Sequence, residues 1–189
     1  MKKNILICGV GGQGTVLASR LISEAALKKG LAVMSAETIG MAQKGGSVFS
    51  HIRLGDDLKS PLIPKGQADL IIGCEPAEAV RMLPFLKKDG AVVVNSAPVK
   101  PVTAALTNNS YDGSEMLEFL KKIVKRLTII DCRAAAKQIG SAKVANIILL
   151  GAALRTGELP ISEEDLAEAI KSRVKKSFVE LNIKALQYA

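Results

Sequence analysis

A glycine-rich turn between an apolar strand and a helix, within the first 29 residues, constrains this chain more than any other feature. Ile5–Cys8 is a short apolar run with β-branched residues, which predicts a buried strand. Gly9, Gly11 and Gly14 then follow the spacing G-x-G-x-x-G, and the apolar residues of Thr15–Lys29 recur at helical spacing. This order favours a phosphate site, because the free amides at a helix start attract anions. The alternative is a tight turn that binds no ligand.

Strands and helices alternate along the rest of the chain. Apolar runs predict further strands at 31–36, 48–54, 68–74, 91–95 and 127–132. Amphipathic patterns predict helices at 77–83, 114–125, 134–139, 142–156 and 162–175, followed by a last helix that carries Phe178, Leu181 and Leu186. This alternation predicts an α/β, Rossmann-like fold, with a mostly parallel sheet, helices on both faces and a C-terminal helical segment. We expect a single domain, with an α/β core at 1–132 and C-terminal helices at 133–189.

The net charge of +8 restricts the partners that the chain can bind. The lysines and arginines are densest at 121–126 and 171–176, on helical patterns whose other face is apolar, which indicates solvated helix faces. With no tryptophan and few other aromatic residues, the chain lacks a stacking platform for single-stranded nucleic acid. The sequence therefore favours a polyphosphate ligand or an acidic partner subunit over nucleic acid.

The three cysteines have no spacing typical of a metal site. Cys8, Cys74 and Cys132 each end an apolar run, and none forms a C-x-x-C pair, so we expect buried free thiols in a reducing cytoplasm and no iron–sulfur cluster in this chain. No apolar run is long enough to cross a bilayer, and the chain begins without a secretion signal. We therefore expect a cytoplasmic protein with no membrane partner.

The only histidine lies on an alternating strand just after a polar glycine turn. Within Val48–Leu54, the side chains of Phe49, His51 and Arg53 share one face. An imidazole beside a guanidinium suits an anionic ligand or a carbonyl group. The alternative is a histidine packed at a subunit contact, with Arg53 pointing into water.

Other polar residues follow the predicted strands. Glu37, at the end of the second strand, could bind the ribose of a dinucleotide. Glu75, Asn95 and Ser96 follow later strands and are weaker candidates, because turn and cap chemistry also explains them. No Ser/His/Asp or Cys/His set and no pair of carboxylates at one site can be recognised, and a single histidine cannot build a multi-histidine metal centre.

Two stretches of the chain, read together, resemble one protein family. The turn Gly9–Gly14 and the segment 37–55, Glu-Thr-Ile-Gly-Met-Ala-Gln-Lys-Gly-Gly-Ser-Val-Phe-Ser-His-Ile-Arg-Leu-Gly, are similar to the gamma-type subunit of 2-oxoacid:ferredoxin oxidoreductases. Within that family the chain most resembles the small (beta) subunit of indolepyruvate:ferredoxin oxidoreductase, and the resemblance covers nearly the whole length. It implies one subunit of an enzyme, inactive by itself, in the oxidative decarboxylation of a 2-oxoacid to an acyl-CoA.

The resemblance also implies where the cofactors bind. Thiamine diphosphate and iron–sulfur clusters would belong to a larger partner subunit, ferredoxin would be reduced by the complex, and this chain would contribute the coenzyme A side of the site and hold no metal. The implied phosphate turn consists of Gly9, Gly11, Gly12, Gln13, Gly14 and Thr15. The implied lining of the cleft consists of Gln43, Gly45, Gly46, Ser47, Ser50, His51 and Arg53. In that lining His51 and Arg53 would be catalytic, and Arg53 and Lys44 would offset phosphate charge.

Two other functions remain open from the sequence. Glu37 favours a free-standing NAD(P)-dependent oxidoreductase, which the lack of a recognisable catalytic acid or base argues against. A non-catalytic nucleotide-binding module is the third possibility.

Overall fold

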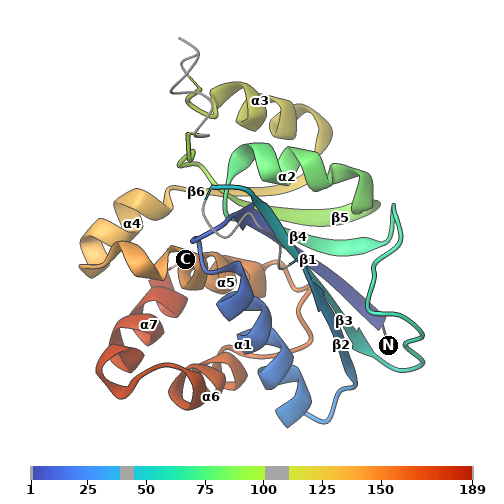
Figure 1. Ribbon diagram of the computed structural model, residues 1–189, viewed down its shortest axis with the longest axis vertical. Helices are drawn as coiled ribbons and strands as arrows, with labels where there is room; N and C mark the ends of the chain where they lie inside the picture. The colour runs from blue at the N-terminus through green and yellow to red at the C-terminus, as the bar shows by residue number, and fades with distance from the viewer. Residues whose placement is uncertain (1, 39–44, 101–110, 189) are drawn as a thin grey trace.

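One six-stranded sheet organises the computed structural model, which describes residues 2–38, 45–100 and 111–188. The strand order is β2-β3-β1-β4-β5-β6 (Figure 1). The strands are β1 (Lys2–Val10), β2 (Val33–Glu37), β3 (Ser47–Gly55), β4 (Ala68–Gly73), β5 (Leu86–Asn95) and β6 (Arg126–Ile130). β1, β4, β5 and β6 run parallel, whereas β3 is antiparallel to both of its neighbours, β1 and β2.

The antiparallel strand β3 distinguishes this sheet from a wholly parallel one. A parallel crossover needs about a dozen residues or more, and the connection 38–46 between β2 and β3 is shorter than that. β3 accordingly pairs antiparallel with β2, and in the sheet it lies between β1 and β2. The predicted α/β fold with a mostly parallel sheet is confirmed, and the sheet is mixed at this side.

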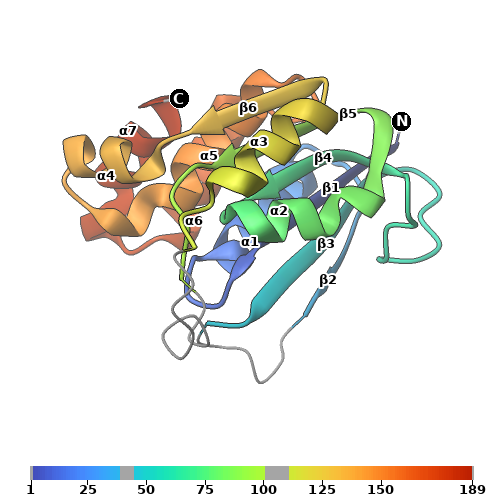
Figure 2. The same ribbon diagram turned by 90° about the horizontal axis from the view of Figure 1, so that it is seen from above.

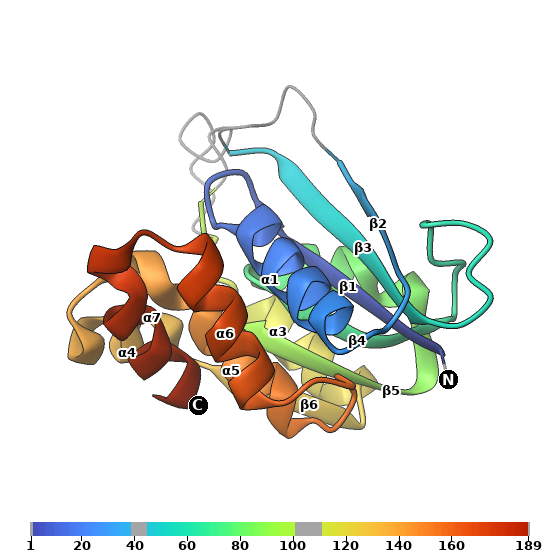
Figure 3. The same cartoon turned by 90° about the horizontal axis from the view of Figure 1, so that it is seen from below.

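Helices cover both faces of the sheet. On one face lie α1 (Thr15–Lys28), α4 (Cys132–Ile139), α5 (Ala145–Arg155), α6 (Glu163–Arg173) and α7 (Lys176–Tyr188); on the other lie α2 (Pro76–Met82) and α3 (Ser114–Ile123) (Figures 2 and 3). The short 3₁₀ turns η1 (Leu83–Phe85) and η3 (Ala142–Val144) follow α2 and precede α5. β5 begins at Leu86, five residues before the strand predicted at 91–95, because its polar start extends past the apolar run.

The alternation of β1 divides the core into two clusters. Ile5 and Ile7 pack with α1 and α5, whereas Leu6 and Cys8 pack with α2 and α3. All four side chains are fully buried, which explains why the strand reads as a continuous apolar run. The first cluster also contains Leu186 of α7, so the C-terminal helices share a core with the sheet.

A glycine sets the close crossing of α5 and α7. A Cβ atom at Gly151 would lie 2.1 Å from the carbonyl oxygen of Leu186, which is backbone and cannot rotate away. We predict that Gly151→Ala lowers the free energy of unfolding by about 1–3 kcal/mol, since overpacking outweighs the better helix propensity of alanine. Urea unfolding followed by circular dichroism measures this, and an increase in stability would contradict the crossing described here.

Candidate functional site

The glycine turn leaves the start of α1 without a cap. The N-cap residue is Gly14, at φ 77°, so no N-cap side chain accepts a hydrogen bond from the first amides of the helix. The first turn of the helix holds no acidic residue. Gly12 also has a left-handed φ, of 102°. The first helical hydrogen bond runs from the Ala18 amide to the Gly14 carbonyl, so the earlier amides of the helix lack an intrahelical acceptor. A phosphate would complete this turn with amide hydrogen bonds and a favourable helix dipole.

Gln13 braces the turn with its side chain. Its Oε1 atom accepts a hydrogen bond from the Val10 amide at 2.7 Å, and its Nε2 atom donates to the Cys74 carbonyl at 3.0 Å. The side chain thus joins the carboxyl ends of β1 and β4. A Cβ at Gly9 would lie 2.6 Å from that Oε1 atom, so Gly9 makes room for the brace. The structure gives Gln13 a scaffolding contact at the predicted phosphate turn.

The segment before β3 meets the same turn. The Gly11 amide donates to the Gly46 carbonyl at 2.9 Å, and Gly45 has a left-handed φ of 81°. The Ser47 hydroxyl donates to Glu78 of α2. These contacts bring Gly45–Ser47 beside the turn, whereas Gln43 and Lys44 lie outside the described residues. The cleft lining implied by the resemblance stays a prediction for these residues. Thr15 and Ser50 are buried, at the start of α1 and within β3.

Two adjoining pockets open beside the glycine turn. One, of about 320 Å³, lies between Gly12–Gly14 and the start of α5. The other, of about 550 Å³, lies between the end of β5 and α4. Asn95, Ala142 and Ala145 line both, so the two form one cleft at the carboxyl edge of the sheet, where open α/β folds bind ligands.

Asn146 is a buried residue of this cleft that the sequence patterns did not reveal. Its Nδ2 atom donates to the Gly14 carbonyl at 3.0 Å, and its Oδ1 atom accepts from the Ile147 amide. A Cβ at Gly14 would lie 2.6 Å from that Nδ2 atom. The sequence showed a polar residue at the start of an apolar helix, but it could not show that this asparagine contacts Gly14, 132 residues earlier in the chain.

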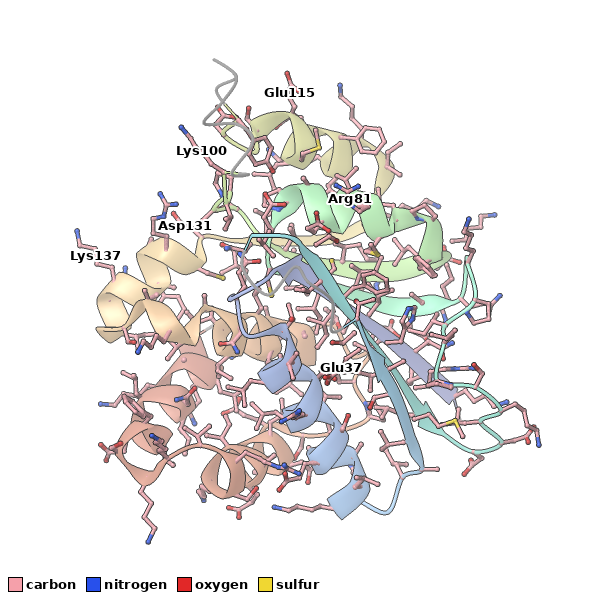
Figure 4. All side chains as sticks on the ribbon, viewed as in Figure 1. Glu37, Arg81, Lys100, Glu115, Asp131 and Lys137 are labelled. Atoms are coloured by element: carbon pink, nitrogen blue, oxygen red, sulfur yellow. The ribbon has the colours of Figure 1, made fainter. Side chains whose placement is uncertain are left out.

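Three cations line the cleft: Arg133 and Lys137 of α4, and Lys143 of η3. All three are exposed, and none forms an ion pair with another residue in the described part of the chain. Figure 4 shows Lys137 extending from α4 into solvent. Exposed cations along this cleft create a positive potential that suits a ligand with several phosphates.

The polar residues that follow β4 and β5 have structural partners. The side chain of Asn95 donates to the Cys74 carbonyl at 3.1 Å and accepts from the amides of Ala97 and Cys132, which joins the ends of three strands. Ser96 donates its amide to the Ile130 carbonyl. The turn chemistry that the sequence offered as the alternative explanation is therefore present at both residues.

The start of α2 holds two buried glutamates, of which the sequence did not single out Glu78. Glu75 and Glu78 are both buried at the start of α2, where Glu75 caps the helix by accepting the Glu78 amide at 3.0 Å. The Tyr111 hydroxyl donates to Glu75. Burial and that hydrogen bond raise the pKa of Tyr111, so the phenol stays protonated as a donor. The i, i+3 spacing of the two glutamates was visible in the sequence, but their burial was not.

His51 and Arg53 lie away from the glycine turn. β3 is antiparallel to β1, so Arg53 pairs with Asn4 near the start of β1, six residues before Val10. Its guanidinium donates to the Asn4 side chain at 2.9 Å and to the Ser60 carbonyl at 2.8 Å. The Nδ1 atom of His51 accepts the Ile63 amide at 3.2 Å. Both residues thus anchor the loop 56–66, and the catalytic role implied by the resemblance stays a prediction.

The geometry argues against a dinucleotide bound by Glu37. Glu37 ends β2, and β3 separates β2 from β1, so two strand spacings, about 10 Å, lie between Glu37 and the strand that leads into the glycine turn. A ribose beside that turn would need the acidic residue on the adjacent strand. The argument for NAD(P) therefore loses its one supporting residue.

The three cysteines are free and buried, as predicted. Burial raises the pKa of Cys74 and of Cys132 to about 12, and raises that of Cys8 as well, so the thiols are neutral and unreactive at pH 7. Among the described residues, no group of three His, Cys, Asp or Glu side chains could hold a metal ion. In the same residues no helix is long and apolar enough to cross a membrane.

Comparison with known proteins adds relatives over the full chain. The model of the pyruvate ferredoxin/flavodoxin oxidoreductase family matches residues 4–189. Indolepyruvate oxidoreductase subunit IorB of Archaeoglobus fulgidus is 39% identical over 188 residues, which are 99% of this chain and 93% of the relative.

Two solved structures share the fold. The gamma subunit of a keto/oxoacid ferredoxin oxidoreductase from Geobacter sulfurreducens has a TM-score of 0.72 at 26% identity, covering 100% of this chain and 94% of its own. The 2-oxoglutarate:ferredoxin oxidoreductase from Magnetococcus marinus, solved with 2-oxoglutarate, coenzyme A and succinyl-CoA, has a TM-score of 0.71 at 20% identity. That match covers 98% of this chain and 30% of the Magnetococcus chain.

The buried His51 predicts a pH dependence of stability. Burial lowers its pKa from 6.5, so the unfolded chain takes up a proton that the folded chain resists. The free energy of unfolding should therefore fall as the pH drops below about 6.5. His51→Asn keeps an acceptor for the Ile63 amide without a titrating group, and should lose this part of the dependence. Urea unfolding of both proteins at several pH values between 7.5 and 5.5 measures the difference, and parallel curves would refute it.

Proposed function

The chain belongs to the pyruvate ferredoxin/flavodoxin oxidoreductase family, and from that premise we propose that its glycine turn and basic cleft bind the phosphates of coenzyme A. The family assignment confirms the resemblance of residues 9–14 and 37–55, and makes the chain the small subunit of a 2-oxoacid:ferredoxin oxidoreductase. One observation carries the proposal: a helix start with a left-handed glycine N-cap and no side-chain cap lies at a cleft lined by three exposed cations.

Each part of the ligand has a matching part of the cleft. The diphosphate fits the amides at the start of α1, where the dipole favours negative charge and no acidic side chain competes. The 3′-phosphate fits the larger pocket beside Arg133 and Lys137, since a guanidinium and an ammonium group bind phosphate by charge-assisted hydrogen bonds. The coenzyme A that was solved with the Magnetococcus enzyme supports the same ligand class.

The catalytic chemistry requires a partner chain. Thiamine diphosphate, when bound to the larger subunit, supplies the decarboxylation chemistry, and iron–sulfur clusters of the complex carry the electrons to ferredoxin. The described residues of this chain offer no metal-binding group for such a cluster. The Archaeoglobus relative supports indolepyruvate as the 2-oxoacid of the complex.

We predict that the chain is active only in the complex. Co-expressed with a thiamine-binding larger subunit, it should give coenzyme A-dependent reduction of ferredoxin by aryl pyruvates, because the reactive cofactors bind the partner. The assay measures ferredoxin reduction by the purified complex and by each subunit. Turnover by this chain without a partner would contradict the assignment, and activity without coenzyme A would contradict the role of the cleft.

A second prediction locates the 3′-phosphate. The double variant R133A/K137A should raise the KM of the complex for coenzyme A by about 10–100-fold, the loss of one or two charge-assisted bonds, and leave the KM for the 2-oxoacid unchanged. It should also discriminate less between coenzyme A and dephospho-coenzyme A than the wild-type complex does. Steady-state kinetics of the wild-type and variant complexes, with coenzyme A and with dephospho-coenzyme A as substrates, measure both effects.

The matched control for that experiment removes two exposed cations elsewhere. K175A/K176A, at the turn between α6 and α7, changes the net charge equally without touching either pocket. If the control raises the KM for coenzyme A as much as R133A/K137A does, the change in KM comes from the net charge of the protein, and the proposed 3′-phosphate subsite is wrong.

A further inference from the structure

Asn146 places a buried amide group at the wall of the smaller pocket. It is the second residue of α5, it is 4% exposed, and it lines this pocket together with Gly12–Gly14. The residues that follow, Ile147–Leu150, are buried in the core cluster that α1 and α5 share on one face of the sheet (Figure 3). The asparagine is therefore held at the pocket by a well-packed helix and not by a loop.

Two hydrogen bonds fix which way this amide group faces. Its Oδ1 atom accepts the Ile147 amide at 3.1 Å, and its Nδ2 atom donates to the Gly14 carbonyl at 3.0 Å. Exchanging the oxygen and the nitrogen would set an N–H against an N–H and an oxygen against an oxygen, so both bonds would be lost. Asn146 must therefore present its NH₂ group, and not its oxygen, to the glycine turn.

The bond to Gly14 also aims the next backbone amide. The Gly14 carbonyl accepts the Ala18 amide at 3.1 Å as well, so two donors hold it along the axis of α1. In a trans peptide the N–H group points opposite to the carbonyl group, and this peptide bond is trans. The amide of Thr15 therefore points out of the start of α1, on the side of the glycine turn.

The second N–H of the Asn146 side chain is left without a partner. The NH₂ group carries two donors, and within the residues that the structure describes only the Gly14 carbonyl accepts from it. A buried donor is unfavourable until a ligand or a water molecule accepts from it. The pocket beside it, of about 320 Å³, is also lined by the exposed cation Lys143. An anionic oxygen in this pocket is the acceptor that this N–H and the Thr15 amide both lack.

We propose that Asn146 is a binding residue for the diphosphate of coenzyme A. One N–H of its side chain holds the Gly14 carbonyl and thereby the Thr15 amide, and the other donates to a phosphate oxygen. This role rests on the proposed function, which puts the diphosphate at the start of α1, and it extends the diphosphate site to α5. It is separate from the 3′-phosphate contacts of Arg133 and Lys137.

The test uses the complex with three thiols: coenzyme A, dephospho-coenzyme A, and pantetheine, which has no diphosphate. Asn146→Leu keeps the size of the side chain and removes both donors. It should raise the KM for coenzyme A and for dephospho-coenzyme A by the same factor, about 10–100-fold, because one or two hydrogen bonds to a charged group are lost. The kcat, the KM for the 2-oxoacid, and the kcat/KM for pantetheine should stay unchanged.

Asn182→Leu is the matched control. Asn182 is a buried asparagine of α7 that donates to the Phe178 carbonyl at 2.7 Å and lines neither pocket. Its variant removes a comparable buried hydrogen bond and should leave every KM unchanged. Asn146→Ala, which leaves space where leucine fills it, should give the same change in KM as Asn146→Leu. Circular dichroism and thermal unfolding establish that each variant is folded.

The outcomes separate this role from the proposed function. If the Asn146 variants leave the KM for coenzyme A unchanged while R133A/K137A raises it, the role of Asn146 is wrong and the proposed function stands. A loss with pantetheine as large as that with coenzyme A, or an equal effect of Asn182→Leu, would assign Asn146 to the fold alone and overturn the proposal. If neither set of variants changes the KM for coenzyme A, both proposals are wrong.

Discussion

One side chain joins the carboxyl ends of the neighbouring strands β1 and β4. Gln13 forms hydrogen bonds to Val10 at the end of β1 and to Cys74 just after β4, and a Cβ atom at Gly9 would clash with its Oε1 atom. The backbone bond from the Cys74 amide to the Cys8 carbonyl, at 2.7 Å, joins the same strand ends. These hydrogen bonds fix the position of the turn that precedes α1, because Gln13 belongs to that turn. The first amides of α1 have no intrahelical acceptor, so this junction of β1 and β4 is what holds them in place.

Much of the fold could be predicted because the sheet is covered on both faces. Strands buried on both faces read as continuous apolar runs, and helix starts such as Ser162–Asp165 carry a local capping signature that the structure contains. The place of β3 could not be predicted in this way. Strand order depends on which edges meet in space, and the alternation of Val48–Leu54 is the same for either neighbour.

The candidate site likewise contains features that depend on local sequence, which could be predicted, and features that depend on contacts between distant residues, which could not. The glycine turn was visible because its requirement is local: a left-handed backbone at Gly12 and Gly14 needs glycine whatever surrounds it. The hydrogen bond of His51 to the loop 56–66 could not be predicted, because the sequence pattern is the same for an imidazole that binds a ligand and for one that accepts a backbone amide. The cations of α4 were hidden for a related reason. Arg133 and Lys137 lie more than a hundred residues from the turn in the sequence, and only the packing of α4 and α5 brings them to the pocket that adjoins it.

The hydrogen bond between Asn146 and Gly14 links the C-terminal helices to the glycine turn of the α/β core. A fragment ending at residue 132 would keep every strand and every glycine of the turn, yet it would lack the amide group that fixes the Gly14 carbonyl. The C-terminal helices therefore could not be removed without losing part of the cleft. These helices form the far wall of the cleft beside the glycine turn, and a shortened homologue would have to rebuild that wall with another polypeptide.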